Sequence, residues 1–545
     1  MNGLQVQPPS DADTLLSQGL FILIAFVQLL SIMVAAAAAP LVRRRYRRRV
    51  LRLMGLNHVA SLPSVTGTWK ATQPLSARPR AAFAAYGVDG LAALALRREH
   101  RVTRATVLAW LTFAGVAALV EGLYPKAGLA QCLAFFAVAA LLALGPALSN
   151  LPGRWTRWSL AIGFIACVLG YVFLGRDTSG PDANAPLLQM ILIGLAIGWA
   201  YVAMFHRRLR GQVLPMFVVL SICLLLWLVP CAYLEFYAGP WFARFTDAKQ
   251  GSPSLVAAQL IFYPLCVFFL WVAFRLLDAL ERLIRRGLVS ELSLGCVVSL
   301  TLIAIAMLAA GGESRGIWWD WATLPWMAAT VGMYALALGR PPDDSTGPQL
   351  LVLRVFSKDT DKQTLLDELQ ARWRYVGAVH EIGGPDMVDL NVNPYESLMF
   401  LSNRLHELFL PLAPSLAQLK ARLQTAPDHE GRYRINEVFC FNTAWHSTVD
   451  QLMQLSDAIV LDLRGLTAQR QGTVYEIRLL ARDALLDKVV AVVDDSTDWA
   501  HVDSLLRAEG GNPRRLMRLS SDKELQSQEL FTKLLQVAAR PPSAS

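Results

Sequence analysis

Long apolar runs fill the first 340 residues of the chain, and they limit what it can fold into more than any other feature. A run of about 20 apolar residues can cross a bilayer as a helix. Hydrophobic residues make up 54% of the sequence, which is high for a soluble protein of 545 residues. The runs predict about nine transmembrane helices, at 15–39, 105–124, 128–148, 158–174, 187–205, 213–237, 255–277, 292–310 and 317–338.

Charges between these runs predict how the helices are oriented. A cluster of arginines directly follows the first run: Arg43, Arg44, Arg45, Arg47, Arg48 and Arg49. Basic loops stay in the cytoplasm, so the N-terminus is expected outside and the C-terminus inside. The net charge of +9 is concentrated in this first loop, which favours a role in topology over nucleic-acid binding. We therefore expect a multi-pass protein of a bacterial-type inner (plasma) membrane, with the lipid bilayer as its partner.

The remainder of the first loop, up to Arg104, is partly apolar. The segment Gly90–Arg98 predicts a short amphipathic piece lying along the membrane surface. A transport path would require ionisable residues inside the spans, and Glu121, Glu235 and Arg275 all lie near predicted span ends. Charged residues at such positions usually reach the headgroups, which favours a membrane anchor. A transporter with a regulatory cytoplasmic domain is the alternative.

A break in composition separates two predicted domains. The segment Arg340–Pro348 is rich in proline, glycine and short polar residues, which end a helix and favour a linker. We expect a membrane domain over residues 1–340, a linker over 341–349 and a cytoplasmic α/β domain over 350–545.

Short apolar strands alternate with helical patterns beyond the linker. Strands are expected at 350–356, 378–382, 435–441, 458–463, 489–493 and 515–519. Helices are expected at 362–375, 394–410, 415–423, 444–455, 473–481, after Asp498 and at 523–538. This alternation predicts a three-layer α/β fold with a mostly parallel sheet.

The stretch Ser456–Val493 reads as a complete strand, loop, helix and strand. Parallel sheets bind ligands at the carboxyl ends of their strands. Here that end carries Asp462, Arg464 and Gly465, and Glu476 lies on the helix that follows. These residues are our candidates for a nucleotide site.

Common catalytic and binding motifs are absent. The sequence has no GxxxxGK[ST], GxGxxG, HExxH or GxSxG pattern. None of its seven cysteines forms a CxxC pair, and the histidines show no metal-ligand spacing, so no metal site is expected.

Several short motifs of the C-terminal domain resemble a TIR domain. The first strand ends in Ser357-Lys358-Asp359, and a later strand opens with Ser456-Asp457 before an apolar run. The helix that follows carries Tyr475-Glu476-Ile477. The likeness covers about 80 residues. Two features depart from the family pattern, which has Trp-Cys where Gly472 and Thr473 stand and lacks the extra stretch 383–434. Another nucleotide-binding Rossmann-like family and a deoxyribosyltransferase-like fold are the alternatives.

The TIR resemblance implies NAD as substrate, cleavage of its nicotinamide–ribose bond and Glu476 as the catalytic residue. A carboxylate beside the ribose would stabilise the oxocarbenium character of this reaction. Arg464 would meet a phosphate, and Ser357 and Asp359 would line the pocket. Glu476 and Arg464 each have an alternative interpretation without a function. Glu476 could be an exposed first-turn glutamate that the helix dipole favours, and Arg464 could be a charged residue of a surface loop.

Two functional hypotheses therefore stand beside the transporter. In the first, the membrane-anchored domain binds a nucleotide such as NAD and acts as an NAD glycohydrolase. In the second, it is a non-enzymatic signalling or scaffold module. Clustering of copies through the membrane part, forming a homo-oligomer, is a hypothesis for how either would be triggered.

Overall fold

The computed structural model describes residues 11–55, 86–122, 211–224, 253–294, 317–339 and 347–540, with short gaps inside these ranges. The chain divides into two compact units. One comprises residues 1–42, 103–337 and 393–398, and the other comprises residues 43–102, 338–392 and 399–545. The second unit contains the predicted α/β domain apart from residues 393–398, together with residues 43–102, which the sequence placed in the membrane domain.

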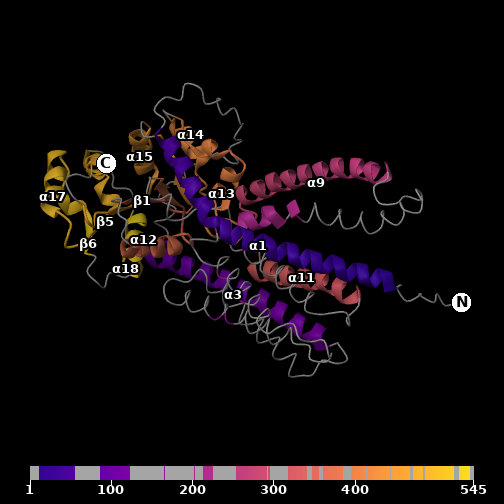
Figure 1. Cartoon of the computed structure of the whole chain (residues 1–545). Coiled ribbons are helices and arrows are strands. Elements are labelled where there is room, and N and C mark those ends of the chain that lie inside the picture. Colours follow the sequence, from indigo (N-terminus) through magenta and orange to yellow (C-terminus); the bar gives the residue numbers. More distant parts are fainter. Residues whose placement is uncertain are drawn as a thin grey trace. The chain divides into compact units, whose positions relative to one another are not determined.

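Long helices cover four of the predicted spans (Figure 1). They are α1 (Asp11–Met54), α3 (Gly87–Gly122), α9 (Pro253–Arg285) and α11 (Ile317–Leu338). Within the part of the chain that the structure describes, no helix is both long and apolar enough to cross a membrane. The spans predicted at 128–148, 158–174 and 187–205 lie outside the described residues apart from isolated positions, and those at 213–237 and 292–310 are described only in part.

Six parallel strands form the centre of the second unit. They are β1 (Leu350–Arg354), β2 (Val379–Ile382), β3 (Ile435–Val438), β4 (Ala458–Asp462), β5 (Val489–Val493) and β6 (Met517–Ser520). Their order across the sheet is β3-β2-β1-β4-β5-β6, and every neighbouring pair is parallel. Strands buried on both faces explain the uninterrupted apolar runs of β1, β4 and β5. The predicted three-layer α/β fold is confirmed, and its strand order is Rossmann-like.

Helices cover both faces of this sheet. On one face α12 (Thr360–Trp373) lies beside α18 (Ser527–Ala538), which also contacts β4 and β5 (Figure 1). The other layer consists of α15 (Trp445–Leu455), α16 (Gln471–Arg482) and α17 (Trp499–Ala508), which contact one another in sequence. Leu353 and Leu461 share a buried core with residues of this second layer. Because side chains alternate along a strand, Arg354 and Asp462 face the α12 and α18 layer.

One predicted helix is shorter than expected. The pattern over 394–410 gives α13 (Pro394–Leu401), followed by a 3₁₀ helix, η3 (Leu405–Leu408), before α14 (Leu416–Arg422). Asn403 adopts a φ of 58°, and the Arg404 N–H donates to the Met399 carbonyl at 2.8 Å. This left-handed residue with a backward hydrogen bond is a helix stop that asparagine tolerates well.

The C-terminal end of α1 and the N-terminal end of α3 pack within the α/β unit. Arg98 is 8% exposed, donates from Nη1 to the Tyr375 carbonyl at 3.1 Å and lies 5.4 Å from the ring centroid of Tyr433. Tyr46 meets Phe400 edge to face, with centroids 5.6 Å apart. Leu91 and Ala95 of the segment Gly90–Arg98 are buried as well, whereas Leu96 is 53% exposed. Arg98 thus ties the segment to the α/β unit, and its contact with a membrane surface stays a prediction. Periodicity shows an apolar face but not what covers it.

A fully buried histidine makes this unit sensitive to acid. His380 of β2 contacts Gln349 Oε1 through Nε2 (3.1 Å) and Asn436 Nδ2 through Nδ1 (3.3 Å). Burial lowers the pKa of His380 from 6.5 to about 4. Below pH 6.5 the unfolded chain therefore binds a proton at His380, whereas the folded unit does not until the pH is near 4. The free energy of unfolding falls as the pH drops from 6.5 to 4, by about 3 kcal/mol in total at about 1.4 kcal/mol per pKa unit.

We expect His380→Gln to remove this loss of stability between pH 6.5 and 4. The measurement is the denaturant midpoint of the α/β unit across that range, in the parent and the variant. If the substitution itself changes stability by the same amount at every pH, this change does not affect the slope of the midpoint against pH, so the slopes of the two proteins are compared. Parallel pH profiles in the two proteins would contradict the assignment.

Candidate functional site

The chain reverses its direction across the sheet between β1 and β4, which are neighbours in the sheet although β2 and β3 lie between them in sequence. The loops leaving such a pair diverge, and the crevice at their carboxyl ends is where Rossmann-like sheets bind ligands. Asp462 is the last residue of β4, and Arg464 and Gly465 follow it at this edge, where the strand pattern placed them. Ser357 and Asp359 belong to the segment between Arg354 and Thr360, which lies outside the described residues.

Asp462 and Arg464 bind each other. The guanidinium donates from Nε to Oδ1 at 2.8 Å and from Nη2 to Oδ2 at 2.7 Å, and the Arg464 N–H also donates to Oδ1 at 3.2 Å. Both side chains are 5% exposed. This bidentate geometry is the strongest form of an arginine–carboxylate pair. Arg464 is therefore a buried, bonded residue, and the reading of it as a surface loop charge is wrong.

A second buried arginine stands next to this pair. Arg354, the last residue of β1, is the register partner of Asp462. Its Nη2 lies 3.8 Å from Oε1 of Glu381, which also accepts a hydrogen bond from Gln370 of α12. Two carboxylates and two guanidiniums thus alternate across β2, β1 and the end of β4, with formal charges that cancel. The apolar pattern of β1 concealed Arg354 from the sequence analysis.

The loops after β4 and β5 are joined by polar contacts that the sequence did not reveal. Gly465 has a φ of 73°, which favours glycine, and its N–H donates to Asp494 Oδ1 at 3.2 Å. Thr497 Oγ1 donates to the Leu463 carbonyl at 3.0 Å and contacts Asp494 Oδ1 at 3.0 Å. The helix after this loop, α17, is capped by Asp498, which accepts a hydrogen bond from the His501 N–H. These bonds fix the backbone at the carboxyl end of the switch-point strand.

Glu476 differs from the other candidates because one oxygen of its carboxyl group finds no hydrogen-bond partner within the described part of the chain. It is 6% exposed, and its Oε2 makes no hydrogen bond. Burial raises the pKa of Glu476 from 4.5 to about 8, so the group is neutral at pH 7. A buried polar atom without a partner costs about 1–3 kcal/mol. The reading of Glu476 as an exposed first-turn glutamate is therefore wrong.

Glu476 and Asp462 belong to opposite sides of the sheet. Asp462 faces the layer of α12 and α18, whereas α16 lies in the other layer. On α16 the neighbouring Tyr475 meets Trp445 and His446 of α15, with ring centroids 5.5 and 4.3 Å apart. Glu476 lies about 100° further around the helix, between that contact and the sheet-facing Ile477. A ligand that touched both acids would have to lie over the carboxyl edge of the sheet.

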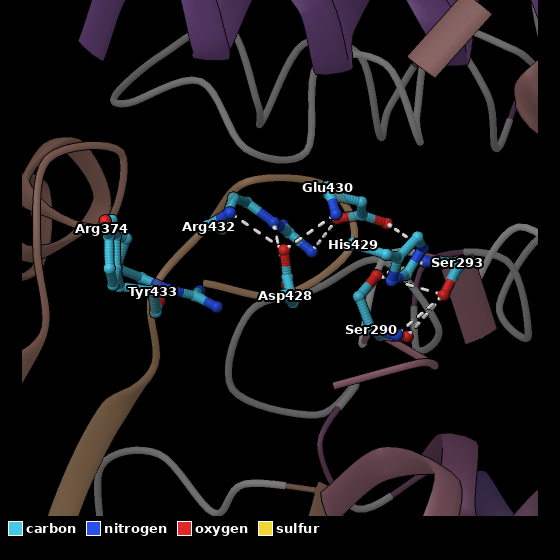
Figure 2. Close-up of polar contacts among 8 residues, drawn as sticks. All are labelled: Ser290, Ser293, Arg374, Asp428, His429, Glu430, Arg432 and Tyr433. Carbon is cyan, nitrogen blue, oxygen red and sulfur yellow. Dashed lines mark hydrogen bonds and ion pairs between the residues drawn. The ribbon is translucent and has the colours of Figure 1, made fainter. Parts of the chain in front are cut away.

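A further group of buried charges lies away from this edge, in the loop before β3 (Figure 2). Asp428 Oδ1 accepts from the N–H groups of Glu430 (3.0 Å) and Arg432 (2.9 Å), and Arg432 forms ion pairs with both acids. Arg374 Nε donates to the Tyr433 carbonyl at 2.9 Å. Because this loop enters β3, it lies at the amino end of the sheet, and its charges stabilise the turn. Among the residues described, no three His, Cys, Asp or Glu side chains are placed to hold a metal ion.

Comparison with models of protein families, with curated proteins and with solved structures gives no match. The fold and the site therefore stand on the geometry of this chain alone.

Proposed function

We propose that the chain is a membrane-anchored protein whose Rossmann-like domain binds a nucleotide such as NAD at the carboxyl ends of β1 and β4 and cleaves it at the nicotinamide–ribose bond. Gly465 and the Asp462–Arg464 pair would contact the nucleotide from the β4 side, and Ser357 and Asp359 from the β1 side. The observation that carries the proposal is the buried carboxyl group of Glu476 on the helix that follows β4, whose Oε2 has no hydrogen-bond partner among the residues that the structure describes.

A carboxyl group held in this way suits the chemistry. Cleavage of an N-glycosidic bond builds positive charge on the ribose, and a nearby carboxylate in a water-poor site stabilises that charge strongly. The nicotinamide ring of NAD is cationic, so its approach would favour ionisation of Glu476. The likeness to TIR domains supports the same role, because Ser456-Asp457 directly precedes β4 and Glu476 lies on α16.

Membrane anchoring rests on the apolar runs, the loop charges and one feature of the helices. Large apolar side chains on α9 are more than half exposed, among them Val267 (65%), Trp271 (54%) and Phe274 (64%). On α11 Leu336 is 77% exposed. Exposed apolar surface of this kind marks contact with lipid or protein. The expected location is a bacterial-type inner membrane, with the α/β domain in the cytoplasm.

The test is nicotinamide release from NAD by the full-length chain in membranes, followed by chromatography. We expect release by the parent and a loss of at least a hundredfold in Glu476→Gln, with kcat/KM rising up to about pH 8 as Glu476 loses its proton. Glu529, in the first turn of α18, provides the control Glu529→Gln, which should keep full activity. Release that is equal in all three proteins would contradict the role of Glu476.

A non-enzymatic signalling module is the second candidate, and the Asp462–Arg464 pair favours it. Arg464 already donates to Asp462 through Nε and Nη2, so contact with a phosphate would require it to rearrange. If the domain is a signalling module, the parent would bind NAD or ADP-ribose without releasing nicotinamide. Calorimetry on the same sample separates the two candidates.

A further inference from the structure

The end of α1 presents an apolar face to the α/β unit. Tyr46, Val50, Leu53 and Met54 are each at most 4% exposed. They belong to the same hydrophobic core as residues of β1, β4 and α15. Their spacing of four, three and one residues places them on one side of the helix. This segment of α1 is therefore a packed part of the α/β unit.

The opposite face of the same segment is basic and exposed. At about 100° per residue, the four arginines on it centre about half a turn from Tyr46 and Val50. They are Arg44, Arg45, Arg48 and Arg52, called the arginine face below. None of them makes an ion pair within the described part of the chain. Four like charges in two turns repel one another, so a surface of this kind fits an anionic partner.

Position along α1 indicates what that partner is. The helix is continuous from Asp11 to Met54, and its predicted apolar run ends at Ala39. Arg44 and Arg48 follow Ala39 by about 8 and 14 Å at 1.5 Å per residue. The headgroup layer on each side of the hydrocarbon core is about 6 Å thick, and arginine side chains extend along the helix toward it. Both guanidiniums are thus within reach of lipid phosphates.

We propose that the arginine face binds the phosphate groups of anionic phospholipids, while the apolar face of the same helix turns holds the α/β unit. The inference rests on the proposed membrane anchoring. It makes residues 43–54 a two-sided connector, with the nucleotide domain on one side and the inner lipid surface on the other. Recognition is by charge, so any phospholipid with net negative charge serves.

The test uses the full-length protein in vesicles of phosphatidylcholine, alone or mixed with phosphatidylglycerol. The variant carries Arg44→Gln, Arg45→Gln, Arg48→Gln and Arg52→Gln. The matched control removes the same charge from exposed positions of the α/β unit, with Arg478→Gln, Arg507→Gln, Arg514→Gln and Arg515→Gln. Native mass spectrometry counts the phosphatidylglycerol molecules retained, and resistance of Cys440 to alkylation reports that the unit is folded.

A basic residue near an anionic surface contributes about fivefold to binding. We expect the variant to retain phosphatidylglycerol at least tenfold less than the parent, and the control to match the parent. Equal retention in parent and variant would overturn the inference and leave membrane anchoring standing. Extraction of the parent from membranes by alkaline carbonate would overturn both. Binding of single-stranded RNA through the same arginines, with no preference for phosphatidylglycerol, would replace lipid by nucleic acid as the partner.

Discussion

Glu476→Gln is expected to stabilise the α/β unit at neutral pH while it abolishes nicotinamide release. The pKa of Glu476 is about 8 in the folded unit and near 4.5 in an unfolded chain. Above pH 4.5 the unfolded chain ionises and the folded unit stays neutral, so stability falls as pH rises to 8 and is then constant. At about 1.4 kcal/mol per pH unit, the loss reaches about 3 kcal/mol at pH 7. Glutamine cannot ionise, so the variant avoids this loss.

Cys440 provides a reporter for this measurement. Its thiol is buried among the core residues of the α/β unit, and burial raises its pKa to about 12, so the folded protein should resist alkylation. In a protein whose other six cysteines are replaced, the alkylation rate of Cys440 reports opening of the unit. At pH 7 we expect the unit to open less often in Glu476→Gln than in the parent. At pH 4.5 we expect the two proteins to open to a similar extent. The same advantage at both pH values would show that ionisation of Glu476 is not the cause.

A result of this kind would separate function from structure at Glu476. If Glu476 lowers stability and is needed for activity, glutamate is kept at this position for function and not for folding. A residue that lowers stability with no effect on activity would favour the signalling candidate and would leave the unpartnered oxygen to be explained by packing.

The elements of the α/β domain could be predicted because each one is local in origin. β5 was predicted at 489–493 and forms there, because Val-Val-Ala-Val-Val is β-branched at four of its five positions and can be buried on both faces of the sheet. α15 and α16 begin and end within two residues of their predicted limits, because their apolar positions recur at helical spacing. Asn403 ends α13 early through a backbone conformation that many asparagines do not adopt, and periodicity carries no sign of it.

The site was predicted less completely because burial of charge depends on distant partners. Asp462, Arg464 and Gly465 were placed at the carboxyl edge from the strand pattern alone. Arg354 was read as one residue of an apolar strand, and its contact with Glu381 depends on the pairing of β1 with β2. Likewise, the burial of Glu476 and the packing of residues 46–54 in the core of the α/β unit require knowledge of which surfaces meet. A sequence shows which faces of a helix are apolar, but the packing of the fold decides what covers them.

The Asp462–Arg464 pair carries the second large expected effect. Asp462→Asn removes the charge but keeps the shape, and it leaves a guanidinium that is 5% exposed without its carboxylate. Removing one partner of a buried pair costs about 3–5 kcal/mol. We expect a loss of this size in the opening free energy reported by Cys440. The double variant Asp462→Leu/Arg464→Met should recover most of it, because it leaves no buried charge unpaired.

Ligand dependence of this variant distinguishes the two roles of Arg464. If Arg464 meets a phosphate, ADP-ribose supplies an anion where Asp462→Asn has lost one, and the ligand should stabilise Asp462→Asn more than the parent. A ligand that binds the folded state at 100 times its Kd adds about 2.7 kcal/mol, so a difference in affinity is measurable as a difference in opening. Equal stabilisation of the two proteins would mean that Arg464 serves only to orient Asp462. In that case the nucleotide phosphates must be bound from the β1 side of the switch point, where Ser357 and Asp359 follow the strand.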